Sequence, residues 1–70
     1  MYTYKVNVED MKSKHDAEII REAFEAESET AVVTYKLAKK EVLIDSDFSV
    51  EEIYQIIEDA GYTPGDLELV

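Results

Sequence analysis

The chain has 70 residues, 46% of them hydrophobic, and a formal net charge of −10 at pH 7. This length predicts one domain with a small core, covering residues 1–70. This excess of acidic residues argues against nucleic acids and anionic lipid surfaces as partners, because both attract cationic proteins. Because the chain has no cysteine, disulfides and thiol chemistry are excluded. No apolar run is long enough for membrane insertion and the N-terminus does not resemble a signal peptide, so we expect a cytoplasmic protein.

The first half of the chain changes its hydrophobic period once. Residues 2–8 alternate, which predicts a strand with one buried face formed by Tyr2, Tyr4, Val6 and Val8. From Ser13 to about Glu27 the apolar residues recur at helical spacing. This pattern predicts an amphipathic helix that buries Ala17, Ile20, Ala23 and Phe24.

The second half repeats this order of elements. Residues 28–37 and 40–45 alternate again and predict two strands, joined by a tight turn at residues 38–39. Ser49 and Glu52 have the spacing of a capping box, which predicts a second helix starting there. Gly61 is the expected end of that helix, and residues 67–70 predict a short last strand.

The predicted order of elements is therefore β-α-β-β-α-β. With right-handed crossovers, this order packs most simply as a four-stranded antiparallel sheet with two helices on one face. We therefore predict the α+β class and a ferredoxin-like fold.

The loop before the first predicted helix reads Met-Lys-Ser-Lys-His-Asp-Ala over residues 11–17. It resembles the metal loop of the heavy-metal-associated domain family, which includes small copper chaperones and N-terminal domains of metal-transporting ATPases. That loop reads Met-x-Cys-x-x-Cys, so Met11 matches, whereas Ser13 and Asp16 stand at the positions of the two cysteines. Residues 42–45 and 49–64 are also similar to the family. The resemblance implies the ferredoxin-like fold and an ancestry in metal handling.

The replaced cysteines indicate a loop that caps its own helix. Ser13 and Asp16 have the spacing of a capping box, in which each side chain accepts a hydrogen bond from a backbone amide. Thiolates are the ligands that Cu(I) prefers, so binding of Cu(I) by thiolates is excluded and no cofactor is expected. We interpret Met11 as a core residue that supports the loop.

A second hypothesis keeps a metal at the same loop. His15, Asp16 and Asp10 carry donor groups that suit a harder ion, so weak zinc or nickel binding is the alternative. Against it, a tight site needs three or four converging ligands, and neighbouring residues on a helix point apart. The positive end of the helix also disfavours a cation.

The basic residues predict an interaction surface. Four of the seven basic residues lie in the connections expected at one end of the sheet, and the resemblance places an aromatic residue beside the metal loop. We predict that this end contacts a protein partner, such as an acidic surface or a metal-transporting ATPase domain, through Lys12, Lys14, Lys39, Lys40 and Tyr62. The expected assembly state is a monomer or weak dimer.

No nucleophile–base constellation or phosphate-binding loop is present in the sequence, so no enzyme is expected. The favoured function is an accessory or protein-interaction module in metal homeostasis. The alternatives are a carrier of a harder metal ion through His and carboxylates, and a ferredoxin-like regulatory module unrelated to metals.

Overall fold

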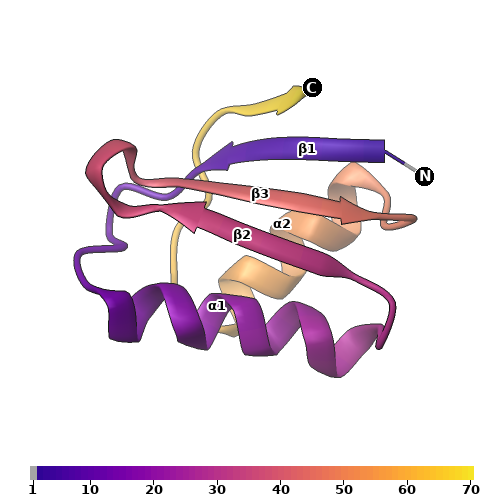
Figure 1. Cartoon of the computed structure of the whole chain (residues 1–70), viewed down its shortest axis with the longest axis horizontal. Helices are drawn as coiled ribbons and strands as arrows, with labels where there is room; N and C mark the ends of the chain where they lie inside the picture. The colour runs from indigo at the N-terminus through magenta and orange to yellow at the C-terminus, as the bar shows by residue number, and fades with distance from the viewer. Residues whose placement is uncertain (1) are drawn as a thin grey trace.

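The computed structural model describes residues 2–70 and contains the six predicted elements in the predicted order (Figure 1). One additional short 3₁₀ helix, η1, lies between the second and third strands. The elements are β1 (Tyr2–Asn7), α1 (Lys14–Glu27), β2 (Val32–Lys36), η1 (Leu37–Lys39), β3 (Glu41–Ser46), α2 (Val50–Asp59) and β4 (Leu67–Leu69).

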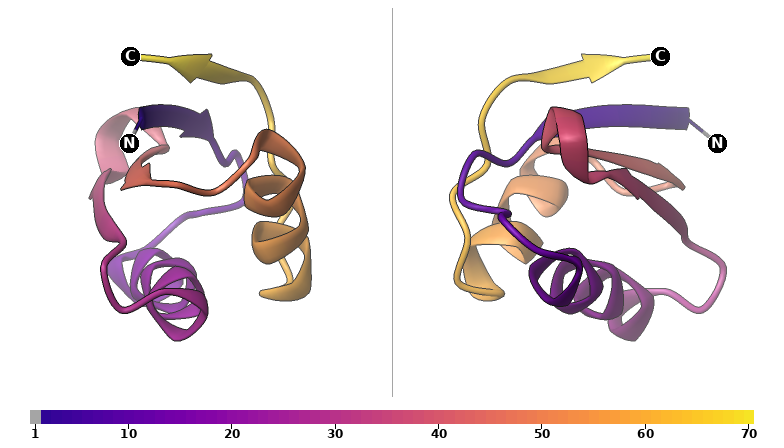
Figure 2. Two further views of the ribbon diagram at one scale, coloured as in Figure 1. Left: turned by 90° about the vertical axis from the view of Figure 1, so that its right-hand side faces the viewer. Right: turned by 60° about the vertical axis from the view of Figure 1, so that its left-hand side comes forward.

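The four strands form one sheet in the order β2-β3-β1-β4, and all three pairings are antiparallel. Both helices lie on the same face of this sheet, as Figures 1 and 2 show from three sides. The predicted ferredoxin-like fold is confirmed. Within residues 2–70, neither helix has the length and apolar character needed to cross a membrane.

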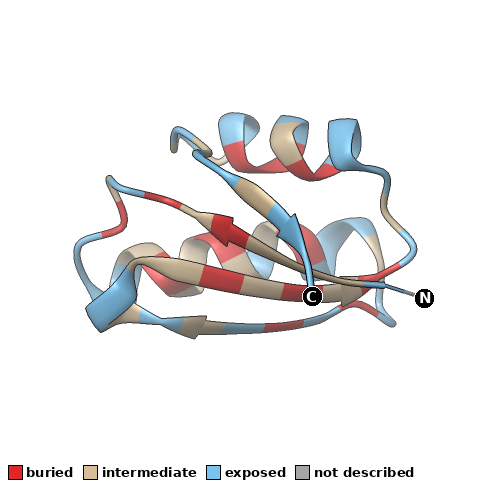
Figure 3. Cartoon of the chain, turned by 90° about the horizontal axis from the view of Figure 1, so that it is seen from above, coloured by how far each residue is buried: buried red, intermediate tan, exposed pale blue. Residues whose placement is uncertain are grey.

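The core lies between the sheet and the two helices. Because side chains alternate between the faces of a strand, every second residue of β3 is buried, and Figure 3 shows this banding along the central strands. Ile20 and Phe24 of α1 and Ile53 and Ile57 of α2 close the core from the other side, each with none of its surface exposed. The core thus fixes the orientation of both helices relative to β1.

The connection between β2 and β3 differs from the predicted tight turn. The chain forms η1 and then places Lys40 in the left-handed conformation, with φ 54°. A non-glycine residue rarely adopts this conformation, which is why the turn type could not be read from a segment without glycine. The strand bounds also differ, because β2 begins at Val32 after a turn rather than at residue 28.

Candidate functional site

The loop between β1 and α1 is anchored to the sheet and to the core. The Val8 backbone N–H donates to the carbonyl of Lys40 at 2.8 Å, and the Met11 N–H donates to the carbonyl of Val8 at 3.1 Å. The Met11 side chain is 1% exposed and belongs to the hydrophobic core. The loop therefore enters α1 from a fixed position.

The N-terminus of α1 is capped by side chains at the positions where the resemblance places cysteines. Ser13 is the N-cap, and its hydroxyl accepts from the Asp16 backbone N–H at 3.3 Å. The Asp16 carboxylate accepts from the Lys12 backbone N–H at 3.0 Å. The predicted capping box had Asp16 reaching the Ser13 amide, so the return bond extends one residue further back. At α2 the predicted box between Ser49 and Glu52 is complete in both directions.

A long-range hydrogen bond joins this cap to the segment after α2. The Tyr62 hydroxyl donates to Oδ1 of Asp16 at 2.6 Å in a partly buried setting. This bond is the main cause that lowers the pKa of Asp16, followed by the bond from the Lys12 amide. The same bond, with partial desolvation of the ring, raises the pKa of Tyr62 to about 12. The ionised carboxylate and the neutral phenol are therefore the forms that the fold favours.

A second carboxylate makes a parallel connection. Both oxygens of Asp10 accept from the Thr63 backbone N–H, at 3.2 and 3.1 Å. We call the four residues Asp10, Asp16, Tyr62 and Thr63 the carboxylate clasp, because they tie the loop before α1 to the segment after α2. Gly61 has φ +94°, a conformation that side chains disfavour, and it turns the chain so that Tyr62 and Thr63 follow α2 toward the loop.

The backbone after the clasp also approaches β1 closely. The Gly65 N–H donates to the carbonyl of Asn7 at 2.6 Å, and the Asn7 N–H donates to the carbonyl of Asp66 at 2.9 Å. A Cβ atom at Gly65 would lie 3.0 Å from the Asn7 carbonyl oxygen. Residues 62–66 are thus held beside the loop before α1 and the end of β1, and the right-hand view of Figure 2 shows the chain running along both.

Because the carboxylate clasp needs an ionised Asp16 and a neutral Tyr62, we expect the folded protein to lose stability at both low and high pH. The Asp16 contribution is complete above pH about 4, the ordinary carboxyl range, and is lost as the pH falls through its lowered pKa. The Tyr62 contribution is complete below pH about 10 and is lost as the pH rises toward its pKa of about 12. Replacing Tyr62→Phe should flatten the dependence at both ends, measured by thermal unfolding against pH. Tyr54→Phe is the matched control, and an equal flattening there would contradict the assignment.

The three candidate ligands of a harder metal ion, His15, Asp10 and Asp16, do not converge on one point. His15 is exposed on the first turn of α1. Asp10 and Asp16 face residues 62–63, and their oxygens accept the hydrogen bonds described above. Within residues 2–70, no group of three or more His, Cys, Asp or Glu side chains is arranged to hold a metal ion. The residues present also do not fit Cu(I), because the loop carries no thiolate.

The candidate partner-binding lysines lie at the end of the molecule that carries the clasp. Asn7 and Lys36 both pair with Glu41, so the loop after β1 and the turn after β2 meet at one end of the sheet (Figure 1). Lys12, Lys14 and Lys39 are exposed there, and among residues 2–70 they form no ion pair within 4 Å. Lys40 is half-buried and lies 4.0 Å from Glu9.

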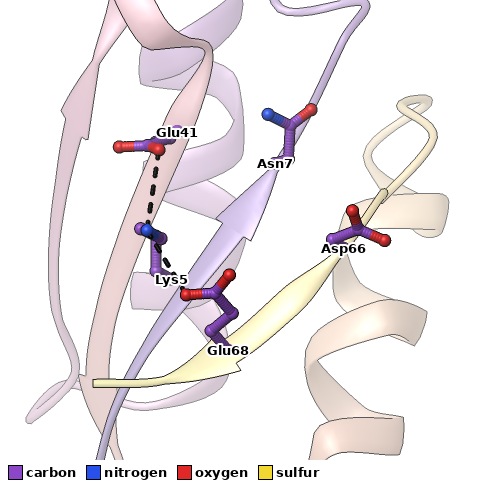
Figure 4. Close-up of a pocket in the computed structure, with 5 residues that line it drawn as sticks. All are labelled: Lys5, Asn7, Glu41, Asp66 and Glu68. Atoms are coloured by element: carbon purple, nitrogen blue, oxygen red, sulfur yellow. Dashed lines mark ion pairs between the residues drawn. The ribbon is translucent and has the colours of Figure 1, made fainter.

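The open face of the sheet carries a shallow polar depression of about 120 Å³ (Figure 4). Lys5 lies at its centre, with its ammonium 3.8 Å from Glu41 and 3.4 Å from Glu68. Asn7 and Asp66 line the rim. Lys5 of β1 thus joins β3 and β4 through two ion pairs, and we treat the depression as part of the sheet surface.

The fold and the loop together define a class of protein, the small ferredoxin-like domains with a structured loop before the first helix. No family model matches the sequence, and no curated protein matches it. Solved structures do match. The copper chaperone Atx1 from Synechocystis PCC6803 has a TM-score of 0.85 and 28% identity, over 87% of this chain and 97% of that chain.

Two further structures extend the comparison. Atu1203 from Agrobacterium tumefaciens is 34% identical, with a TM-score of 0.78 over 84% of this chain and 92% of that chain. The heavy metal binding protein TM0320 from Thermotoga maritima has a TM-score of 0.84 over 97% of this chain and 98% of that chain, and at 18% identity it supports the fold alone. The solved structures that this chain is similar to are thus Atx1-like copper chaperones and heavy-metal-binding proteins, which is consistent with the fold of the heavy-metal-associated domain, and the chain has Ser13 and Asp16 where the loop of that family has two cysteines.

Proposed function

We propose that this chain is an accessory, protein-interaction domain of cytoplasmic metal homeostasis that does not itself carry a metal ion or catalyse a reaction. The observation that carries the proposal is the hydrogen bonding of the loop. Ser13 and Asp16, at the cysteine positions, bond to amides of the loop and to Tyr62. The groups that would face a metal ion in a carrier are therefore engaged within the protein.

The similarity to copper chaperones supports a place in metal homeostasis. Atx1 from Synechocystis PCC6803, whose structure matches 87% of this chain, is a copper chaperone. The chemistry of this loop differs, because a soft metal ion needs sulfur ligands and the chain has none. We therefore propose that this chain contacts other proteins rather than carrying the ion itself.

The surface that we propose for this contact is the lysine end, formed by Lys12, Lys14, Lys39 and Lys40 together with the ring of Tyr62. Three of these lysines are exposed and form no ion pair among residues 2–70. On a body with a net charge of −10, they form a separate region that an acidic protein surface complements. The hydroxyl of Tyr62 donates to Asp16, so a contact with the partner would use the ring rather than the hydroxyl.

Neutralising the lysine end tests the proposed function. The wild type and the double variant Lys12→Gln with Lys39→Gln are each cross-linked to their partners in the native host. The double variant should recover much less of the partner protein than the wild type, because it lacks two exposed positive charges. Thr30→Glu with Thr34→Glu is the matched control, since both sites are exposed and the net charge changes equally. Equal recovery by the wild type and the lysine variant, measured by mass spectrometry, would overturn the proposal.

A further inference from the structure

The outer surface of the two helices contains a groove that the proposed function does not use. It has a volume of about 200 Å³ and is lined by residues of the second half of each helix and the residue that follows α2. These residues are Ala23, Ala26, Glu27, Ile56, Asp59 and Ala60. The floor is apolar, because three of them are alanines and a fourth is the mostly buried Ile56. Small side chains leave room there for a side chain from another molecule.

The rim of the groove is negative for two independent reasons. Glu27 and Asp59 are the last residues of α1 and α2, and both are exposed. Neither helix has a basic residue in its last turn, so the negative ends of both helix dipoles are left without a cation. This is the reverse of the charge distribution that stabilises helix ends.

The positive charge of α1 does not neutralise this rim. Arg21 pairs with Glu18 at 2.6 Å and with Glu25 at 3.5 Å. Asp59 accepts a hydrogen bond from the Gln55 amide at 2.9 Å, which is a neutral donor. Among residues 2–70, Glu27 and Asp59 form no ion pair within 4 Å.

We propose that this groove docks a basic amphipathic segment of a partner protein, with an apolar side chain on its floor and flanking lysines or arginines at its rim. The volume is below the ~300 Å³ typical of small-molecule pockets and suits one or two side chains of a larger partner. A helix that presents apolar anchors one turn apart is a common occupant of such grooves. A second copy of this chain is a poor occupant, because its net charge of −10 opposes its approach to the acidic rim, and docking of its lysine end into the groove is one of the outcomes that the test below detects.

This surface is separate from the lysine end. The lysine end surrounds the first turn of α1, whereas the groove is lined by residues of its last two turns. The two surfaces also require partners of opposite charge. Loss of one interaction therefore leaves the other in place, and each proposal can fail alone.

A designed peptide tests the groove directly. The probe is a helical peptide composed of leucine and lysine with leucines on one face, titrated into the full chain and followed by amide NMR and calorimetry. We expect saturable shifts at residues 23–27 and 56–60. The variant Glu27→Gln with Asp59→Asn should weaken binding about tenfold, because two rim charges are lost. This variant should keep its fold, since it removes repulsion at two helix ends.

Two controls separate docking from general attraction to an acidic protein. Glu29→Gln with Glu51→Gln changes the net charge equally at exposed sites outside the groove and should leave the affinity within about twofold of the wild type. A peptide with serine in place of leucine should bind at least about tenfold more weakly, because the anchor is lost. Equal weakening by both double variants, equal binding of both peptides, or self-association of the chain through the groove residues would each overturn the proposal.

Discussion

Restoring the two cysteines, as Ser13→Cys with Asp16→Cys, is expected to create a Cu(I) site in a protein that otherwise lacks one. The two positions lie in one turn at the start of α1, where the helix dipole favours thiolates. Met11 already supports the loop from the core. The gain should be the largest functional effect of any change in this chain, because two soft ligands appear where none existed.

The measurement is an amide NMR titration with Cu(I), Zn²⁺ and Ni²⁺ in the presence of a competing chelator. The double variant should show saturable shifts at residues 11–17 with Cu(I), whereas the single variant Ser13→Cys should lose the metal to the chelator. The wild type should show no saturable shift with any of the three ions. Saturable Zn²⁺ or Ni²⁺ shifts in the wild type that disappear in His15→Ala would instead establish a carrier of a harder ion and contradict the proposed function.

Replacing Met11→Ala should unfold much of the protein at ordinary temperature. Met11 is 1% exposed and is among the largest fully buried side chains. Truncating such a side chain costs ~2–5 kcal/mol of unfolding free energy. A single domain of this size has only ~3–5 kcal/mol in total. Thermal or urea unfolding followed by circular dichroism measures the difference.

Met11→Leu is the control that separates packing from ligation. Leucine has a similar volume and no sulfur, so the cost should stay below about 1.5 kcal/mol if the side chain acts only in the core. A Met11→Leu variant as unstable as Met11→Ala would show that volume is not what matters at this position. In the variant with both cysteines restored, Met11→Leu should likewise leave the Cu(I) shifts in place.

The elements that could be predicted from the sequence are those that depend on residues close together in the chain. The capping box of Ser49 and Glu52 appears as predicted, because it depends on residues a few positions apart. The strand predicted at residues 2–8 also forms, but Tyr2 of its predicted buried face is 58% exposed, because the core does not extend to that end of β1. The turn at residues 37–40 could not be predicted in the same way. Its left-handed Lys40 is held by the pairing of β2 with β3, since nothing in the segment favours that conformation.

The carboxylate clasp likewise combines contacts between neighbouring residues, which could be predicted, with contacts between distant residues, which could not. The capping of α1 by Ser13 and Asp16 and the lack of a thiolate ligand could both be predicted from the sequence, because capping and ligand chemistry follow from residue type and spacing. The bonds of Asp16 to Tyr62 and of Asp10 to Thr63 span 46 and 53 positions of the chain and could be found only in the folded structure. Such bonds form because the buried core sets where the start of α1 and the end of α2 lie, and that placement comes from the packing of all the elements together.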